Sequence, residues 1–239
     1  MSVFPYCALN LDIVSETDIP ALHSDFGFLY GYGLFETILI QNRRPVFLEE
    51  HIERLQKGTI ILDFPFPYSI QEIRESINQL IEKNDVESAI LNLYLTPGDR
   101  QSNLATIRFS GHRLIAVMRP LSRDYYSTPL EIVIREESIQ RIKMDSLKTM
   151  ACMKNMLEKK LSKAYDDVIL FDDKKQILET PTANVFFVKG TCLFTPKSPC
   201  IVQGVVANFI MKNIESFGVD CLVQEIFLNE VAQFDEVFL

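Results

Sequence analysis

The hydrophobic period changes between residues 69 and 96, and this change limits the fold more than any other feature of the chain. The segment SIQEIRESINQLIEKND, at 69–85, has Ser69 at an N-cap position and apolar residues that share one helical face: Ile70, Ile73, Ile77, Leu80 and Ile81. The segment SAILNLYLT, at 88–96, alternates with the period of a strand. Together the two segments predict helices combined with a sheet.

The remaining segments predict short paired strands mixed with helices. GLFETILIQNRRPVFL, at 33–48, predicts a hairpin that turns at 41–44, and LEEHIERLQKGTIIL, at 48–62, predicts a helix. HRLIAVMRP predicts a buried strand beside 88–96. In the second half we expect strands at 130–136, 167–172, 176–180 and 183–196, and helices around 150–164 and 205–217. This mixture is typical of an α+β or mixed α/β protein.

The chain length and one proline-containing segment predict two domains. A chain of 239 residues is long enough for two modest domains. The segment RPLSR, at 119–123, interrupts two strand-like runs with a proline and polar residues. We therefore predict a smaller N-terminal α/β domain at 1–118, a linker at 119–123 and a larger C-terminal domain at 124–239.

Composition and charge exclude several classes of function. The net charge of −8 argues against nucleic acid or an anionic membrane as a partner, because both attract a basic surface. The five cysteines form no CxxC pair, which argues against a disulfide framework or a metal site and favours a reducing cytoplasm. Neither a signal peptide nor an apolar run of membrane-spanning length is found. No GxSxG segment accompanies the three histidines, so Ser/His/Asp catalysis is not expected. We expect a soluble cytoplasmic protein.

One lysine and one glutamate suggest chemistry on a carbonyl. Lys148 lies in an apolar patch with Leu147 and Met150, and Glu179 ends the strand-like run QILE just before a Thr-Pro-Thr turn. A solvent-facing lysine at a helix start is the ordinary explanation. A buried lysine, however, is easily kept as the neutral amine that forms Schiff bases with carbonyls. Pyridoxal phosphate uses such a lysine, together with a carboxylate or arginine beside its pyridine nitrogen and an anion site.

Two further residues are candidates for that anion site. Gly204 precedes a predicted helix that begins near Val205, where free backbone amides favour an anion. Arg54, in the segment HIERL, has a guanidinium that can bind a phosphate with two hydrogen bonds. A plain loop glycine and a solvated arginine are the alternatives for these two positions.

Five segments of the chain occur in an informative order. YGYGLFETILI contains Gly-x-Gly followed by Phe-Glu, and HIERL has the pattern His-x-x-Arg-Leu. They are followed by the lysine segment SLKTMACMKNMLEKKLSKAYDDVILFD, by LETPTANVFFV, and by FTP with VQGVV after it. In this collinear order the five segments resemble the motifs of the fold-type IV pyridoxal-phosphate enzymes, the class IV aminotransferase family, and within it they resemble aminodeoxychorismate lyase most. The resemblance implies a two-domain fold of the D-amino-acid aminotransferase type and a pyridoxal 5'-phosphate cofactor bound by the C-terminal domain.

The resemblance also implies a role for each matching residue of the cofactor site. Lys148 would be the catalytic residue, forming the Schiff base with the cofactor and shuttling protons, and Glu179 would pair with the pyridine nitrogen. Asn184 would support the cofactor. The phosphate would be held by Arg54 and by the helix start at Gly204, Val205 and Val206. No metal is implied.

The resemblance implies a small-molecule substrate and a homodimer whose active sites include residues of the partner chain. Tyr30 and Phe35 would line the substrate side, and Arg100 in TPGDRQSN would meet a substrate carboxylate. The chain departs from the family where Tyr32 replaces a frequent Asp, where Ala151 and Cys152 stand after the lysine in place of a usual Asn or Tyr, and where a hydroxyl and an arginine are missing after Gly204. The family also continues beyond the strand that ends here in FDEVFL, so we expect the C-terminal domain to lack the usual last segment.

The short length and small insertions in the second half favour one reaction within the family. We predict a lyase that converts 4-amino-4-deoxychorismate to 4-aminobenzoate and pyruvate, a step of folate biosynthesis. The first alternative is an aminotransferase for branched-chain or D-amino acids, which Arg100 leaves open. The second alternative is a degenerate, non-catalytic relative that binds a small molecule.

Overall fold

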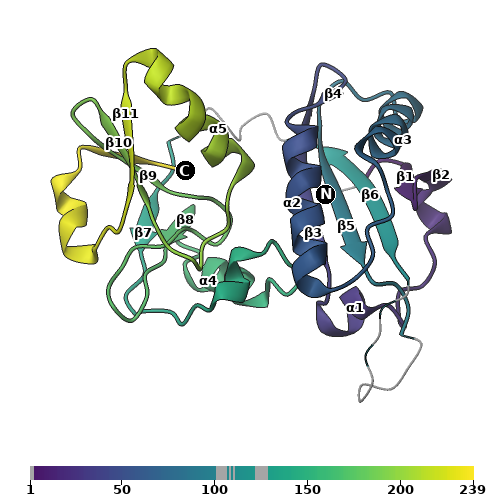
Figure 1. Cartoon of the computed structure of the whole chain (residues 1–239), viewed down its shortest axis with the longest axis horizontal. Coiled ribbons are helices and arrows are strands. Elements are labelled where there is room, and N and C mark those ends of the chain that lie inside the picture. The colour runs from purple at the N-terminus through teal and green to yellow at the C-terminus, as the bar shows by residue number, and fades with distance from the viewer. Residues whose placement is uncertain (1–2, 101–106, 108, 110, 122–128) are drawn as a thin grey trace. The chain divides into compact units, whose positions relative to one another are not determined.

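The computed structural model describes residues 3–100, 107, 109, 111–121 and 129–239, and it combines helices with sheets as predicted (Figure 1). It divides into two compact units. The first comprises Met1–Ser127 with Lys148–Ala151, and the second comprises Thr128–Leu147 with Cys152–Leu239. The tetrapeptide around Lys148 thus packs with the first unit, although the predicted division places it in the C-terminal domain.

The first unit is built on a six-stranded antiparallel sheet with the order β2-β1-β6-β5-β3-β4. The strands are β1 Tyr6–Leu9, β2 Asp12–Ser15, β3 Leu34–Gln41, β4 Arg44–Pro45, β5 Ala89–Thr96 and β6 Arg113–Pro120. The predicted hairpin is confirmed, because β3 and β4 are joined by Asn42 and Arg43, whose φ angles of 51° and 59° are those of a type I′ turn. Arg119 and Pro120 end β6, so the predicted linker starts inside a strand, and its residues 122 and 123 lie outside the described residues.

Two helices, α2 Leu48–Leu62 and α3 Ile70–Lys83, pack against this sheet (Figure 1). The capping box between Ser69 and Glu72 confirms the predicted start of α3. Alternate residues of β3 are buried, and the Leu34 side chain lies so close to Gly58 of α2 that a Cβ there would be 2.6 Å from it. Two shorter helices, η1 Glu16–Asp18 and α1 Phe26–Tyr30, complete the described elements of this unit.

The second unit contains a two-stranded parallel pair and a four-stranded sheet of order β11-β10-β9-β12. Its strands are β7 Ile132–Ile134, β8 Asp167–Ile169, β9 Phe186–Lys189, β10 Cys192–Pro196, β11 Asp220–Gln224 and β12 Glu236–Phe238. Its helices are η4 Lys143–Ser146, α4 Met153–Leu161, α5 Val205–Asn213, η5 Ile214–Phe217 and η6 Leu228–Gln233. One cluster of its core contains Phe171, Ile177 and Phe187, and α5 packs through Ala207 and Ile210 on a second cluster.

Two predictions of secondary structure in the second half were wrong. The segment 176–180 is not a regular strand but makes single bridges, Phe171 to Ile177 and Gln176 to Phe227. The helix expected around 150–164 begins only at Met153, because Lys148, Thr149 and Met150 are instead paired with the start of β3. Within the described ranges, no helix has both the length and the apolar character needed to cross a membrane.

Candidate active site

Lys148 lies on an extended segment that pairs with the start of β3. The backbone N–H of Phe35 donates to the Lys148 carbonyl at 3.0 Å, and that of Met150 donates to Gly33 at 2.9 Å. The close approach requires glycine, because a Cβ at Gly33 would lie 2.7 Å from the Met150 sulfur. Gly31 has a φ of 66°, and a Cβ there would lie 3.0 Å from the Cα of Ala151. The two glycines of the Gly-x-Gly pattern therefore allow the segment around Lys148 to pack closely against the start of β3.

The Lys148 side chain extends over an aromatic ring. Its Nζ is 4.5 Å from the centroid of Phe35, a distance typical of a cation–π contact when the amine is protonated. Phe35 in turn stacks on Tyr94 of β5, with 6.4 Å between centroids and 25° between planes. Alternation along β3 turns Phe35 away from the side on which α2 packs. The structure thus brings together two of the predicted site residues, the catalytic lysine and a substrate-side aromatic.

The other two predicted substrate residues also contact each other. Arg100 Nη1 donates to the Tyr30 hydroxyl at 3.0 Å, and both side chains are exposed. Tyr30 ends α1, whose first turn is capped by the Asp25 carboxylate. A guanidinium beside a phenol offers hydrogen-bond donors suited to a carboxylate.

Arg54, the predicted phosphate ligand, is bound to a buried carboxylate. Its Nε and Nη2 donate to Glu36 at 2.7 Å and 2.5 Å, and His51 Nδ1 lies 2.7 Å from the same carboxylate. Glu36 is 1% exposed. Burial alone raises the pKa of Glu36, but hydrogen bonds from Arg54 and His51 outweigh it, so the pKa lies below its ordinary value. Lys148 and Arg54 contact successive β3 residues, Phe35 and Glu36, which point to opposite faces.

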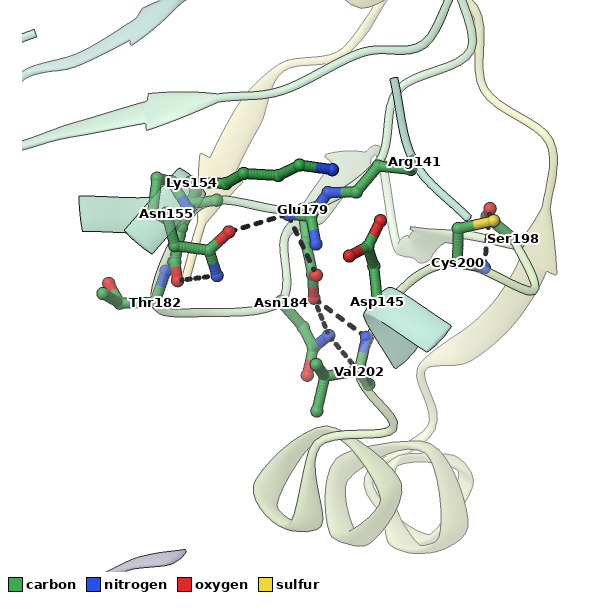
Figure 2. Close-up of polar contacts among 12 residues, drawn as sticks. Arg141, Asp145, Lys154, Asn155, Glu179, Thr182, Asn184, Ser198, Cys200 and Val202 are labelled. Atoms are coloured by element: carbon green, nitrogen blue, oxygen red, sulfur yellow. Dashed lines mark hydrogen bonds and ion pairs between the residues drawn. The ribbon is translucent and has the colours of Figure 1, made fainter. Parts of the chain in front are cut away.

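Glu179 lies in the second unit, where donors from three segments surround its carboxylate (Figure 2). The Val202 backbone N–H is 3.1 Å away and the Asn184 amide is 3.4 Å away, while an Arg141 nitrogen is 3.6 Å away. Glu179 is 4% exposed, and Asn155 of α4 accepts a hydrogen bond from Arg141 at 3.3 Å. This surrounding shell fixes a buried carboxylate in one orientation.

Asn184 also holds the loop that leads into α5. Its amide donates to the Val202 carbonyl at 2.8 Å, and a Cβ at Gly204 would lie only 1.9 Å from Asn184 Oδ1. A glycine is therefore required at position 204 because the Asn184 side chain occupies the space of a Cβ. The sequence suggested a different reason, the approach of the backbone to a phosphate. The predicted helix start is confirmed, with Gly204 as N-cap and Val205 and Val206 in the first turn. The first amides of a helix have no partner within it and favour anions.

Tyr32, which departs from the family pattern, has a structural role. Its hydroxyl donates to the Leu62 carbonyl at 2.6 Å, and its ring packs beside Phe26, Phe64 and Phe109. Burial raises the pKa of Tyr32, and the nearby Asp63 carboxylate raises it further. The tyrosine therefore ties the end of α2 to the Gly-x-Gly turn.

Sequence reasoning missed Glu36 and Arg141. Glu36 could have been found from the sequence, because it is a charged residue at one of the alternate positions of the strand whose side chains are buried. Arg141 lies between β7 and η4, outside any helix or strand of the structure, and no periodic pattern marks it.

The family model described as "Amino-transferase class IV" matches residues 33–239, so the chain belongs to this family. The chain is 28% identical over 213 residues to a probable branched-chain-amino-acid aminotransferase of Rickettsia bellii, covering 87% of this chain and 74% of the relative. It is 27% identical over 240 residues to the aminodeoxychorismate lyase of Bacillus subtilis, covering 97% and 81%. The branched-chain amino acid aminotransferase structure from Escherichia coli superposes with a TM-score of 0.89 at 22% identity, covering 98% and 82%.

These comparisons confirm the fold-type IV architecture and the enzyme class. The family consists of pyridoxal-phosphate-dependent aminotransferases and lyases that act on small molecules, and the chain is an enzyme of this class. The described side chains fit such a cofactor. They include the buried Glu179 carboxylate, which accepts hydrogen bonds from Val202 and Asn184, a lysine beside an aromatic ring, and a helix that begins after a glycine.

Proposed function

We propose that the protein is a pyridoxal-phosphate-dependent lyase that converts 4-amino-4-deoxychorismate to 4-aminobenzoate and pyruvate. The observation that carries the choice is the stacked pair of Phe35 and Tyr94 beside Lys148. A flat apolar platform next to the reacting amine suits a substrate whose amino group is on a six-membered ring. An aliphatic amino acid would use this surface less fully.

The cofactor roles follow the matching positions of the family. Lys148 would be the cofactor-binding lysine, and Glu179 would pair with the pyridine nitrogen. Its fixed orientation by Arg141, Val202 and Asn184 supports that pairing. The phosphate would be held by Arg54 and by the first amides of α5, at Val205 and Val206.

Lys148 would carry the proton transfers. The bound cofactor supplies an electron sink for the carbon that bears the substrate amino group. The Lys148 amine removes the proton from that ring carbon. The C–O bond to the enolpyruvyl group breaks, the ring becomes aromatic, and the released enolpyruvate takes up a proton to become pyruvate. Tyr30 and Arg100 would hold one of the two substrate carboxylates during this step.

The test is a direct assay of both products with the holoenzyme. We expect 4-aminobenzoate and pyruvate to form in equal amounts from 4-amino-4-deoxychorismate. Lys148→Ala should abolish turnover, and Glu179→Gln should lower kcat by roughly a hundredfold. Lys154→Ala and Glu136→Gln are matched controls because both side chains are exposed, and they should behave like wild type. Turnover in Lys148→Ala, or none in the wild type, would contradict the proposal.

An aminotransferase is the second candidate. The resemblance to the Rickettsia bellii relative, at an identity close to that of the lyase, favours it. The same holoenzyme should then transfer the amino group of a branched-chain or D-amino acid to a 2-oxo acid. If neither activity and no bound cofactor were found, a non-catalytic relative would replace both proposals.

A further inference from the structure

Arg113, the first residue of β6, lies between two carboxylates of the first unit. Asp25 is 2% exposed and accepts hydrogen bonds from Arg113, from the Gly27 N–H at 2.8 Å and from the Thr96 hydroxyl at 2.8 Å. Because Asp25 is the N-cap of α1, this contact fixes the helix that ends in Tyr30.

The second carboxylate, Asp99, precedes Arg100 directly. It accepts from Arg113 Nη2 at 2.9 Å and Nη1 at 3.1 Å, and from the Ser24 hydroxyl at 2.7 Å. The Arg100 backbone N–H donates to the Ser24 carbonyl at 2.8 Å. The segment that carries Arg100 is thereby tied to the residues just before α1.

We propose that Arg113 is a positioning residue for substrate recognition. It clamps α1, which carries Tyr30, to the segment that carries Arg100, and so holds the Arg100 guanidinium 3.0 Å from the Tyr30 hydroxyl. The inference rests on the proposed function, in which Tyr30 and Arg100 receive a carboxylate of the substrate. Arg113 itself does not touch that carboxylate.

Charge explains why a neutral residue cannot replace the arginine. Asp25 and Asp99 are bridge partners in the backbone, and Arg113 is the cation that binds both. Without it, the buried Asp25 carboxylate and the 45% exposed Asp99 carboxylate would lie close together and repel. The segment around Asp99 would move away from α1, and the added negative potential would repel a substrate carboxylate.

The experiment is a double-mutant cycle on the holoenzyme. KM and kcat for 4-amino-4-deoxychorismate are measured for wild type, Arg113→Gln, Arg100→Gln and the double variant. Arg113→Lys keeps the charge without the two-pronged contact, and it serves as the test variant if Arg113→Gln fails to fold. Arg43→Gln is the matched control, because Arg43 forms an exposed ion pair with Asp85 in the same unit.

We expect each single arginine-to-glutamine change at positions 100 and 113 to raise KM about tenfold while kcat stays near wild type, since a charge-assisted contact is weakened. The KM of the double variant should be no higher than that of Arg100→Gln alone. The KM of Arg113→Lys should lie between those of wild type and Arg113→Gln, and the KM of Arg43→Gln should equal that of wild type. Additive effects in the double variant, or a fall in kcat at constant KM, would overturn the inference.

A failure of the proposed lyase activity gives a different result. In that case the wild type does not act on 4-amino-4-deoxychorismate, and the same cycle is measured with a branched-chain or D-amino acid, which also carries a carboxylate. If Arg100→Gln leaves KM unchanged for every substrate that the wild type uses, the clamp has no role in recognition and the inference is wrong.

Discussion

At the residue scale, Glu36 is the buried carboxylate that accepts the hydrogen bonds of the Arg54 guanidinium. Replacing it by glutamine removes the charge but keeps the shape, and it leaves the Arg54 guanidinium without its carboxylate partner. We expect Glu36→Gln to lower the free energy of unfolding by about 3 kcal/mol, as is usual when one member of a buried ion pair is removed. Urea denaturation measures this change.

The control for Glu36→Gln is Glu53→Gln on α2. Glu53 is 58% exposed and forms a surface ion pair with Lys57 at 3.8 Å. Its replacement should change the free energy of unfolding by less than about 0.5 kcal/mol. Equal effects of the two changes would show that the buried ion pair contributes no more to the free energy of unfolding than the surface pair does.

The lowered pKa of Glu36 also gives a pH dependence of stability. A carboxyl group whose pKa is lower in the folded state stabilises the fold above its unfolded pKa of about 4.3, and this contribution is lost as the pH falls through the folded pKa. The stability difference between wild type and Glu36→Gln should therefore be constant near neutral pH and shrink in acid. A difference that grew on acidification would contradict this assignment.

Residue types in context predicted part of the site and not the rest. Lys148 and Glu179 could be selected because an isolated lysine in an apolar patch and a glutamate at a strand end are unusual. Arg141 could not be selected, because its importance comes from a long-range contact with Glu179. The roles of the selected residues in cofactor binding stay predictions.

At the element scale, the start of α5 is fixed by contact between Gly204 and Asn184. Gly204→Ala would place a methyl carbon 1.9 Å from Asn184 Oδ1, so the loop or the asparagine must shift. We expect a loss of about 2 kcal/mol in the free energy of unfolding and weaker binding of pyridoxal phosphate. Thermal melts with and without the cofactor measure both effects.

The control for this change is the double variant Gly204→Ala with Asn184→Ala. Removing the asparagine side chain also removes the clash, so the two substitutions should be clearly non-additive. Additive losses would show that the glycine is needed for another reason.

Elements with strong local signals were predicted well, and those that depend on distant partners were not. The α3 helix has a capping box and a regular apolar face, and the β3–β4 hairpin has a polar two-residue turn. The segment at Lys148 has helical composition nearby, but its backbone pairs with Gly33 and Phe35, more than a hundred residues earlier. No local pattern can reveal such a pairing.

At the scale of the whole molecule, family membership leads us to propose a homodimer. Sedimentation velocity of the holoenzyme should give about twice the chain mass of 27.5 kDa. A species of one chain mass that is fully active would contradict this proposal.

The overall class of fold was predictable because five motifs occur in order along the chain.

The central claim is that Lys148 is the residue through which the protein holds pyridoxal phosphate. The most direct test is the visible absorbance spectrum of the protein with saturating cofactor, for wild type, Lys148→Ala and the Lys154→Ala control. We predict a cofactor band in wild type and the control that borohydride bleaches, with the phosphopyridoxyl mass on the peptide that contains Lys148. We predict no such band in Lys148→Ala. The same band in Lys148→Ala, or none in the wild type, would contradict the account.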